Sequence, residues 1–235
     1  MLRFIDVTKT YGDKRVLEGI SLEISRGTST ALVGVNGAGK STLFRLCLDL
    51  ISLDSGQIQI KDIPHRQTEA RQCVAYLPER FSAPHYLTGR EILRGLLALH
   101  QIDYDENAAH SECRTLDFDP ATLNQRARHY SKGMLQKLGL IACTLAQREL
   151  LLLDEPLSGL DPLAQHHYRE RLLSLKAQGT TLFFSTHALR DAAQLCDRIV
   201  LLDKGQIMFD GSSDKLRELA PSGSLNDAFL SLVAR

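Results

Sequence analysis

A glycine-rich segment that also carries a lysine and two hydroxyl residues, 34–42, has the composition needed to bind the phosphates of a nucleotide. Its letters, GVNGAGKST, fit the pattern G-x-x-x-x-G-K-[ST]. Glycines let the backbone approach closely enough for several N–H groups to point at phosphate oxygens. Lys40 can reach the β- and γ-phosphates, and the Ser41 hydroxyl can ligate Mg²⁺. The segment therefore predicts a nucleotide site that includes Mg²⁺.

Two acidic residues, Asp154 and Glu155, follow a run of four leucines at 150–153. A carboxylate at the end of a buried strand can hold Mg²⁺ beside a phosphate-binding loop, and we expect Asp154 to do so. Glu155, one residue further along, could polarise a water molecule for in-line attack on the γ-phosphate. Acids are common at strand ends, so this hypothesis depends on the glycine-rich segment being present in the same chain.

Three weaker signals have an ordinary structural explanation when each is taken singly. Ser131, two residues before Gly133, is typical of a helix cap. Residues 158–161 could simply be a loop before a helix that starts at Pro162. A lone histidine such as His187, which follows an apolar run, is more often structural than catalytic.

The elements that position these residues follow from hydrophobic periodicity. The glycine-rich segment lies between a strand pattern and an amphipathic helix pattern, which is the context that a phosphate-binding loop needs. Strand patterns occupy residues 2–8, 16–25, 30–33, 57–60, 74–77, 150–153, 181–184, 199–202 and 206–209. Helical patterns occupy residues 43–48, 105–115, 133–146, 163–177 and 188–196, with further helices after a cap at Thr88 and Glu91 and after residues 221–224. The alternation predicts an α/β protein with a parallel sheet, and the helical block from about 88 to 146 predicts an inserted subdomain.

The composition narrows the class of protein. The chain has 235 residues, which suffices for one large domain or two small ones, and 28 basic residues balance 28 acidic ones. A net charge of zero gives no electrostatic reason to expect nucleic acid as a partner. Five scattered cysteines predict reduced thiols in a cytosolic protein. We see no secretory signal and no apolar run long enough to span a bilayer.

Taken together and in this order, the motifs resemble those of the ATP-binding cassette (ABC) ATPases, from Tyr11 to about Gly211. The resemblance implies a P-loop NTPase fold, with a RecA-like parallel-sheet core and an N-terminal antiparallel β subdomain. It also implies an inserted α-helical subdomain at about 80–147. We expect a single ABC ATP-binding domain over residues 1–235, ending in a helical tail at about 212–235.

The resemblance assigns roles in binding Mg²⁺ and ATP. Tyr11 would stack on adenine, with Val16 beside the nucleotide. The phosphate-binding residues would be Asn36, Gly37, Ala38, Gly39, Lys40, Ser41 and Thr42. The metal would be held by Ser41, Asp154 and Glu79, the last of these at the Q-loop position.

The resemblance also implies a mechanism that needs two cassettes. In that family ATP is bound between the phosphate-binding loop of one cassette and the signature of a second, which meets it head to tail. Ser131, Gly133 and Met134 would supply the signature contacts, and a homodimer is expected. Glu155 would activate the water, His187 would hold the γ-phosphate, and Lys40 completes the catalytic set.

Three departures from the common pattern point to a subset of the family. Glu79 replaces a glutamine, and Lys132 and Met134 stand where glycine and glutamine are commonest. Lys132 either points to solvent or adds positive charge near the partner's nucleotide. The motifs around these residues look like those of exporters whose membrane subunit is a separate chain, often called type-two or multidrug/antibiotic exporters. The cassette for copper-site maturation of nitrous oxide reductase is similar.

We therefore expect an ATPase that drives an integral membrane permease from the cytoplasmic face of the inner (plasma) membrane. Phe81, Pro84 and Tyr86 would either form part of the docking patch for that permease or pack within the helical subdomain. The alternatives are an ABC ATPase acting on ribosomes or DNA and a cassette that drives maturation of a membrane or copper protein. One cassette, no heptad block and no basic tail favour transport.

Overall fold

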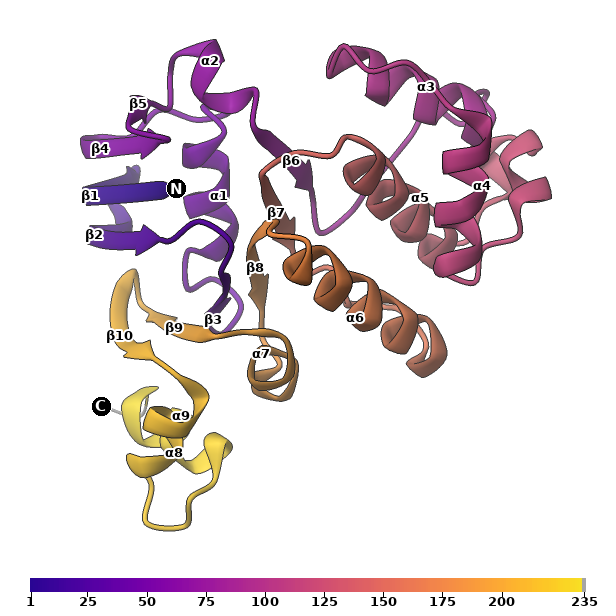
Figure 1. Cartoon of the computed structure of the whole chain (residues 1–235). Coiled ribbons are helices and arrows are strands. Elements are labelled where there is room, and N and C mark those ends of the chain that lie inside the picture. Colours follow the sequence, from indigo (N-terminus) through magenta and orange to yellow (C-terminus); the bar gives the residue numbers. More distant parts are fainter. Residues whose placement is uncertain (234–235) are drawn as a thin grey trace.

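Two β-sheets with an α-helix between them form the centre of the molecule (Figure 1). The structure is a computed structural model and describes residues 1–233. A four-stranded sheet has the order β2-β1-β4-β5, and a six-stranded sheet has the order β10-β9-β3-β8-β7-β6. The strands are β1 (Leu2–Tyr11), β2 (Lys14–Ile24), β3 (Ser29–Val33), β4 (Ser55–Ile60), β5 (Ile63–Pro64), β6 (Val74–Leu77), β7 (Leu150–Asp154), β8 (Thr181–Thr186), β9 (Arg198–Asp203) and β10 (Gln206–Gly211).

Most helices lie where the periodicity predicts them. The α-helices are α1 (Lys40–Cys47), α2 (Thr68–Arg71), α3 (Gly89–Leu99), α4 (Glu106–Thr115), α5 (Lys132–Leu145), α6 (Pro162–Ala177), α7 (Leu189–Leu195), α8 (Ser213–Glu218) and α9 (Leu225–Val233). Two 3₁₀ segments, Pro120–Asn124 and Ala127–His129, interrupt the block that the sequence presents as continuously helical. The prediction did not include β5 or α2, because two and four residues are too few to set up a recognisable period, and α8 lies within the helical tail expected at about 212–235.

The six-stranded sheet is parallel except at one edge, which confirms the predicted α/β fold. Strand β3 runs parallel to β8 and β9, and β7 runs parallel to β6 and β8. At the edge, β10 pairs with β9 in the antiparallel hairpin that the sequence indicates. All five residues of β7 are buried, because both faces of the sheet are covered.

The leucines of β7 belong alternately to two cores. Leu151 and Leu153 pack on the side of α5 and α6, whereas Leu150 and Leu152 pack on the side of α1 and the four-stranded sheet. This alternation follows from the period of two in a strand, and it explains why the run contains no polar residue. The ring of Phe44 from α1 packs edge-on against Phe183 from β8, with centroids 4.9 Å apart.

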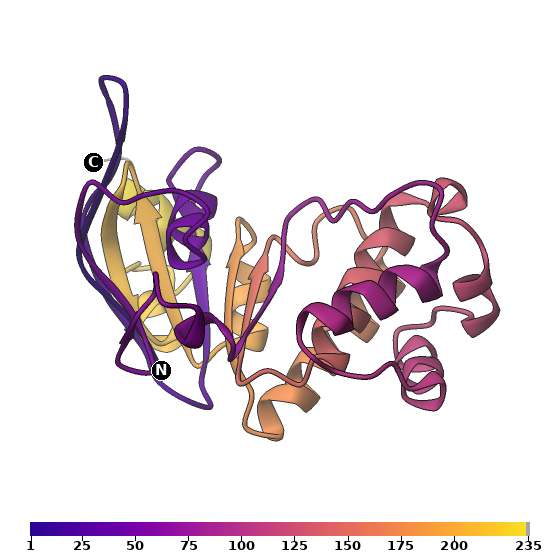
Figure 2. The same cartoon turned by 90° about the horizontal axis from the view of Figure 1, so that it is seen from above.

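The helical part, α3 to α5, projects away from both sheets on the far side of the six-stranded sheet (Figure 2). Helix α3 begins with the predicted capping box, in which the Thr88 hydroxyl accepts from the Glu91 N–H and the Glu91 carboxylate accepts from the Thr88 N–H. A bidentate ion pair between Arg171 of α6 and Glu112 of α4 joins this helical part to the rest of the molecule.

Candidate functional site

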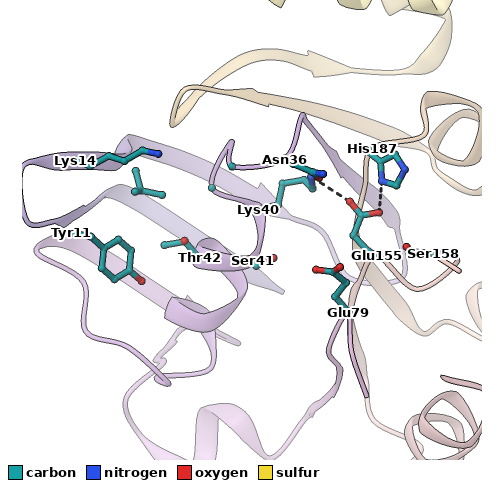
Figure 3. A pocket seen from close by; sticks show the side chains of 13 residues that line it. Tyr11, Lys14, Asn36, Lys40, Ser41, Thr42, Glu79, Glu155, Ser158 and His187 are labelled. Carbon is teal, nitrogen blue, oxygen red and sulfur yellow. Dashed lines mark hydrogen bonds and ion pairs between the residues drawn. The ribbon is translucent and has the colours of Figure 1, made fainter. Parts of the chain in front are cut away.

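A cavity of about 460 Å³ opens where the glycine-rich segment, the ends of β7 and β8 and the turn between β1 and β2 meet (Figure 3). Lys40, Glu155 and His187 lie together in it, and Tyr11 and Lys14 lie toward its other end. The residues that line it are Tyr11, Lys14, Val16, Asn36, Gly37, Gly39, Lys40, Ser41, Thr42, Glu79, Glu155, Ser158 and His187.

The glycine-rich segment forms a tight loop from β3 into α1. Gly37 and Gly39 have φ values of 85° and 112°, in the region where a side chain is disfavoured. A Cβ atom on Gly39 would also lie 2.9 Å from the carbonyl oxygen of Val16. Gly39 is the N-cap of α1 and offers no side-chain cap, so the first N–H groups of the helix remain available to an anion.

Lys40 is the first residue of α1 and is only 6% exposed. Its Nζ atom donates to the carbonyl oxygen of Gly34 at 2.7 Å and lies 3.3 Å from Oε1 of Glu155. A buried ammonium held by a carbonyl and a carboxylate is compensated in charge, which lowers the cost of keeping it out of water. The ammonium of Lys40 can also bind a negatively charged phosphate group placed beside it.

Glu155 follows β7 and is held between two partners. Its Oε2 atom lies 2.8 Å from Nδ1 of His187, and its other oxygen, Oε1, faces Lys40 but has no hydrogen-bond partner although it is buried. The Glu155 backbone is left-handed, with φ of 47°. A carboxylate with a buried oxygen that lacks a donor can accept a proton from a water molecule placed next to it.

The three residues predicted to hold Mg²⁺ offer hydroxyl and carboxylate oxygens, which are the donors this ion prefers. Ser41 and Glu79 line the cavity, whereas Asp154, the last residue of β7, is 3% exposed and is not among the residues that line it. Within residues 1–233, no group of three or more His, Cys, Asp or Glu side chains could hold a metal ion. Hydroxyl and carboxylate oxygens fit an ion that takes its remaining ligands from phosphate and water.

The signature residues lie apart from this cavity. Ser131, Gly133 and Met134 line a second hollow of about 550 Å³ together with Leu160 and Asp161. Ala38 does not line the first cavity either, since it is 3% exposed. The chain therefore does not bring its own signature to its own phosphate-binding loop.

The start of α5 has an unusual cap. The Ser131 hydroxyl accepts from the Met134 N–H at 3.2 Å, as the sequence indicates for a helix cap, and the Met134 sulfur accepts from the Ser131 N–H at 3.4 Å. Lys132 is exposed, which both interpretations require, and its side chain lies over Gly159. Met134 thus supplies the second half of a capping box that a glutamine or glutamate normally supplies.

Two cavity residues were missing from the predicted set. Lys14 is the first residue of β2 and pairs with Tyr11 across the turn, and Ser158 begins the loop 158–161. The sequence does carry a signal for Ser158, because residues 158–161 stand out as a loop before the helix that starts at Pro162. Lys14 has no such signal, since nothing in the local pattern distinguishes it from other exposed lysines.

The aromatic residues after β6 divide between the two alternatives. Phe81 is partly buried and packs against the core of the helical part, so local packing accounts for it. Tyr86 is 71% exposed, and Pro84 is also exposed. Of these three residues, only Pro84 and Tyr86 are exposed enough to contact a partner.

Fold and cavity together define a nucleotide-binding cassette, with a phosphate-binding loop between β3 and α1 and two acids at the end of β7, which β8 separates from β3. Residues 17–158 match the ABC transporter family. The chain is 38% identical to an ABC transporter ATP-binding protein, sll0415, of Synechocystis over 83% of this chain and 56% of that protein. The chain belongs to the ABC transporter family, and the predicted membership is confirmed.

Two further relatives have names that describe their roles. The daunorubicin resistance ATP-binding protein DrrA3 of Streptomyces coeruleorubidus is 34% identical over 89% of this chain and 67% of its own length. The Nod factor export ATP-binding protein I of Burkholderia lata is 35% identical over 92% of this chain and 72% of its own length. The chain thus spans 56% to 72% of the length of these three relatives.

Solved structures support the same fold. The structure of an ATP-binding subunit of an ABC transporter superposes with a TM-score of 0.91 at 32% identity, over 99% of both chains. A dimeric structure of the cassette MJ0796 bound to ADP and Pi superposes with a TM-score of 0.82 at 21% identity, over 90% of this chain and 98% of the other. Among residues 1–233, none of the helices has the length and apolar character needed to cross a membrane.

Proposed function

We propose that the chain is the ATP-hydrolysing subunit of an ABC exporter and drives a separate permease in the membrane. The observation that carries this proposal is Glu155, whose carboxylate is held between Lys40 and His187 beside a phosphate-binding loop. Export is supported by the names of two relatives, which refer to daunorubicin resistance and Nod factor export.

Each part of the cavity has a task in this proposal. The loop N–H groups and Lys40 bind the β- and γ-phosphates, and Tyr11, which is 46% exposed, stacks on adenine. Ser41, Asp154 and Glu79 would hold Mg²⁺, which would neutralise charge that develops on the phosphates. Glu155 accepts a proton from the attacking water, and His187 orients that carboxylate and contacts the γ-phosphate.

Hydrolysis in this proposal requires a second copy of the chain. The signature residues lie in a different hollow from the phosphate-binding loop, so a partner cassette in head-to-tail orientation supplies Ser131, Gly133 and Met134 to the nucleotide. ATP then stabilises the closed dimer, and hydrolysis reopens it. The dimeric form of the related cassette supports this arrangement.

The permease partner is tested by affinity purification of the tagged chain from native membranes solubilised in detergent. We expect an integral membrane protein in stoichiometric amount, and ATP hydrolysis by the complex. Co-purification of an active ATPase with ribosomes or DNA would contradict the exporter role. The same holds if the complex assists maturation of a membrane or copper protein and transports no solute. The Pro84 and Tyr86 side chains offer a control, because their replacement should weaken the complex without changing nucleotide binding.

A further inference from the structure

The side chain of Ser185 lies between the two acids at the end of β7. Its hydroxyl accepts a hydrogen bond from the backbone N–H of Glu155 at 2.9 Å and donates one to Oδ1 of Asp154 at 2.5 Å. Ser185 is fully buried, so solvent does not compete for either bond. One hydroxyl group therefore contacts both Asp154, the proposed Mg²⁺ ligand, and Glu155, the proposed base.

The sheet register explains this placement. Ser185 of β8 is the direct partner of Asp154 in the parallel pairing of β7 with β8, so the two side chains lie on the same face of the sheet. A serine hydroxyl has one proton to donate and two lone pairs. Because the Glu155 N–H occupies a lone pair, the proton is directed toward Asp154.

The bond to the Glu155 N–H holds a backbone conformation that a glutamate rarely adopts. Glu155 has φ of 47°, in the left-handed region that costs energy for any residue with a Cβ atom. This turn aims the Glu155 carboxylate at Lys40 and His187. Without the Ser185 hydroxyl, the N–H group would lose its partner and the turn could relax.

The bond to Asp154 fixes one oxygen of that carboxylate. Within the part of the chain that the structure describes, Ser185 is the one side chain that hydrogen-bonds Asp154. Holding Oδ1 sets the rotation of the carboxylate and leaves Oδ2 for Mg²⁺ or a water of its shell. The serine thus acts on the metal ligand and on the base at the same time.

We propose that Ser185 is a positioning residue that sets the orientation of Asp154 for Mg²⁺ and of Glu155 for the attacking water. This inference rests on the proposed function, since it assigns the two acids those tasks. It adds a residue that touches neither nucleotide nor metal and that the sequence presents only as part of the strand before His187.

The test compares Ser185→Ala with Ser185→Thr and with a matched control, Ser29→Ala, in the full chain. Ser29 is equally buried, but its hydroxyl donates to the sulfur of Cys196, whereas the Ser185 hydroxyl donates to a carboxylate. Three quantities are measured for each: kcat for ATP, the Mg²⁺ concentration at half-maximal activity, and the gain in binding of a fluorescent ATP analogue when Mg²⁺ replaces EDTA. Thermal unfolding reports whether each variant folds.

We expect Ser185→Ala to bind the analogue in EDTA as the wild type does, to lose most of the gain given by Mg²⁺, and to lower kcat by about 10- to 100-fold. Ser185→Thr, which keeps the hydroxyl, should restore most of both effects, and Ser29→Ala should change neither. Unchanged kcat and Mg²⁺ dependence in Ser185→Ala, or equal losses in Ser29→Ala, would overturn the inference about Ser185 but not the proposed function. A wild type that does not hydrolyse ATP would overturn the proposed function as well.

Discussion

The Nζ atom of Lys40 lies 3.3 Å from Oε1 of Glu155, so an ammonium from the phosphate-binding loop faces the carboxylate that follows β7. Both side chains are almost completely buried, at 6% and 10% exposure. Removing one partner from such a pair leaves the other charge buried and uncompensated. Substitution of either Lys40 or Glu155 is therefore expected to affect the other residue as well.

Glu155→Gln tests the acid. The amide keeps the size of the side chain but cannot take a proton from water, so we expect ATP binding and dimerisation to persist while turnover falls by about 100-fold or more. Size-exclusion chromatography with ATP and a phosphate-release assay measure the two effects. Glu149→Gln, at the opposite end of β7, is the matched control and should hydrolyse ATP at the wild-type rate. Normal turnover in Glu155→Gln would remove Glu155 from its role.

Lys40→Ala tests the loop. Loss of the ammonium removes charge-assisted bonds to phosphate, so we expect the affinity for ATP to fall by about tenfold or more and the dimer formed with nucleotide to disappear. Equilibrium binding of a fluorescent ATP analogue and light scattering with ATP measure these effects. A Lys61→Ala control removes an exposed lysine whose partner is Glu149 and should leave both unchanged. A dimer that still forms with ATP in Lys40→Ala would refute the loop assignment.

The sequence predicts those parts of the fold that depend on local pattern. The buried leucines of β7, the capping box at Thr88 and the glycine-rich loop are each defined by neighbouring residues, and the structure contains all three. The parallel sheet follows because strands and helices alternate along the chain. What the pattern cannot supply is the pairing of strands that are far apart in the sequence.

Ser185 shows this limit most directly. It is 31 positions from Asp154, and only the register of β7 against β8 makes them neighbours. Lys14 is similar, since it reaches the cavity through the turn between β1 and β2 rather than through any motif. Phe81 is a residue for which the sequence left two alternatives open, a docking patch or local packing, and the structure covers it with α5.

Alkylation of the cysteines tests the predicted burial. Burial raises the pKa of the Cys143 and Cys113 thiols to about 12, so at pH 8 about 10⁻⁴ of these groups are thiolates, the reactive form. Burial also raises the pKa of Cys73, but this residue is only partly buried. We expect iodoacetamide to modify Cys73 first and Cys143 and Cys113 only in denaturant, as measured by mass spectrometry. Rapid modification of Cys143 in the folded protein would contradict this packing.

Gly139 in α5 lies against the segment that carries Glu79. A Cβ atom at this position would lie 2.5 Å from Cδ1 of Leu77 and 2.9 Å from Cγ of Phe81, which come two residues before and two residues after Glu79. Gly139→Ala should therefore overpack the core, lower the free energy of unfolding by about 1–3 kcal/mol and reduce ATPase activity by moving Glu79. Denaturant titration and a phosphate-release assay measure the two effects.

Gly95→Ala provides the contrast that gives the Gly139 result its meaning. Gly95 lies on the exposed side of α3, and a Cβ atom there would meet nothing within 4 Å. Alanine at this position should raise the free energy of unfolding by about 0.5–1 kcal/mol, because it restricts the unfolded chain and favours the helix. Activity should not change. If both variants were equally stable, the packing of α5 on Leu77 and Phe81 would not be as tight as the structure places it, and the link between the helical part and Glu79 would lose its basis.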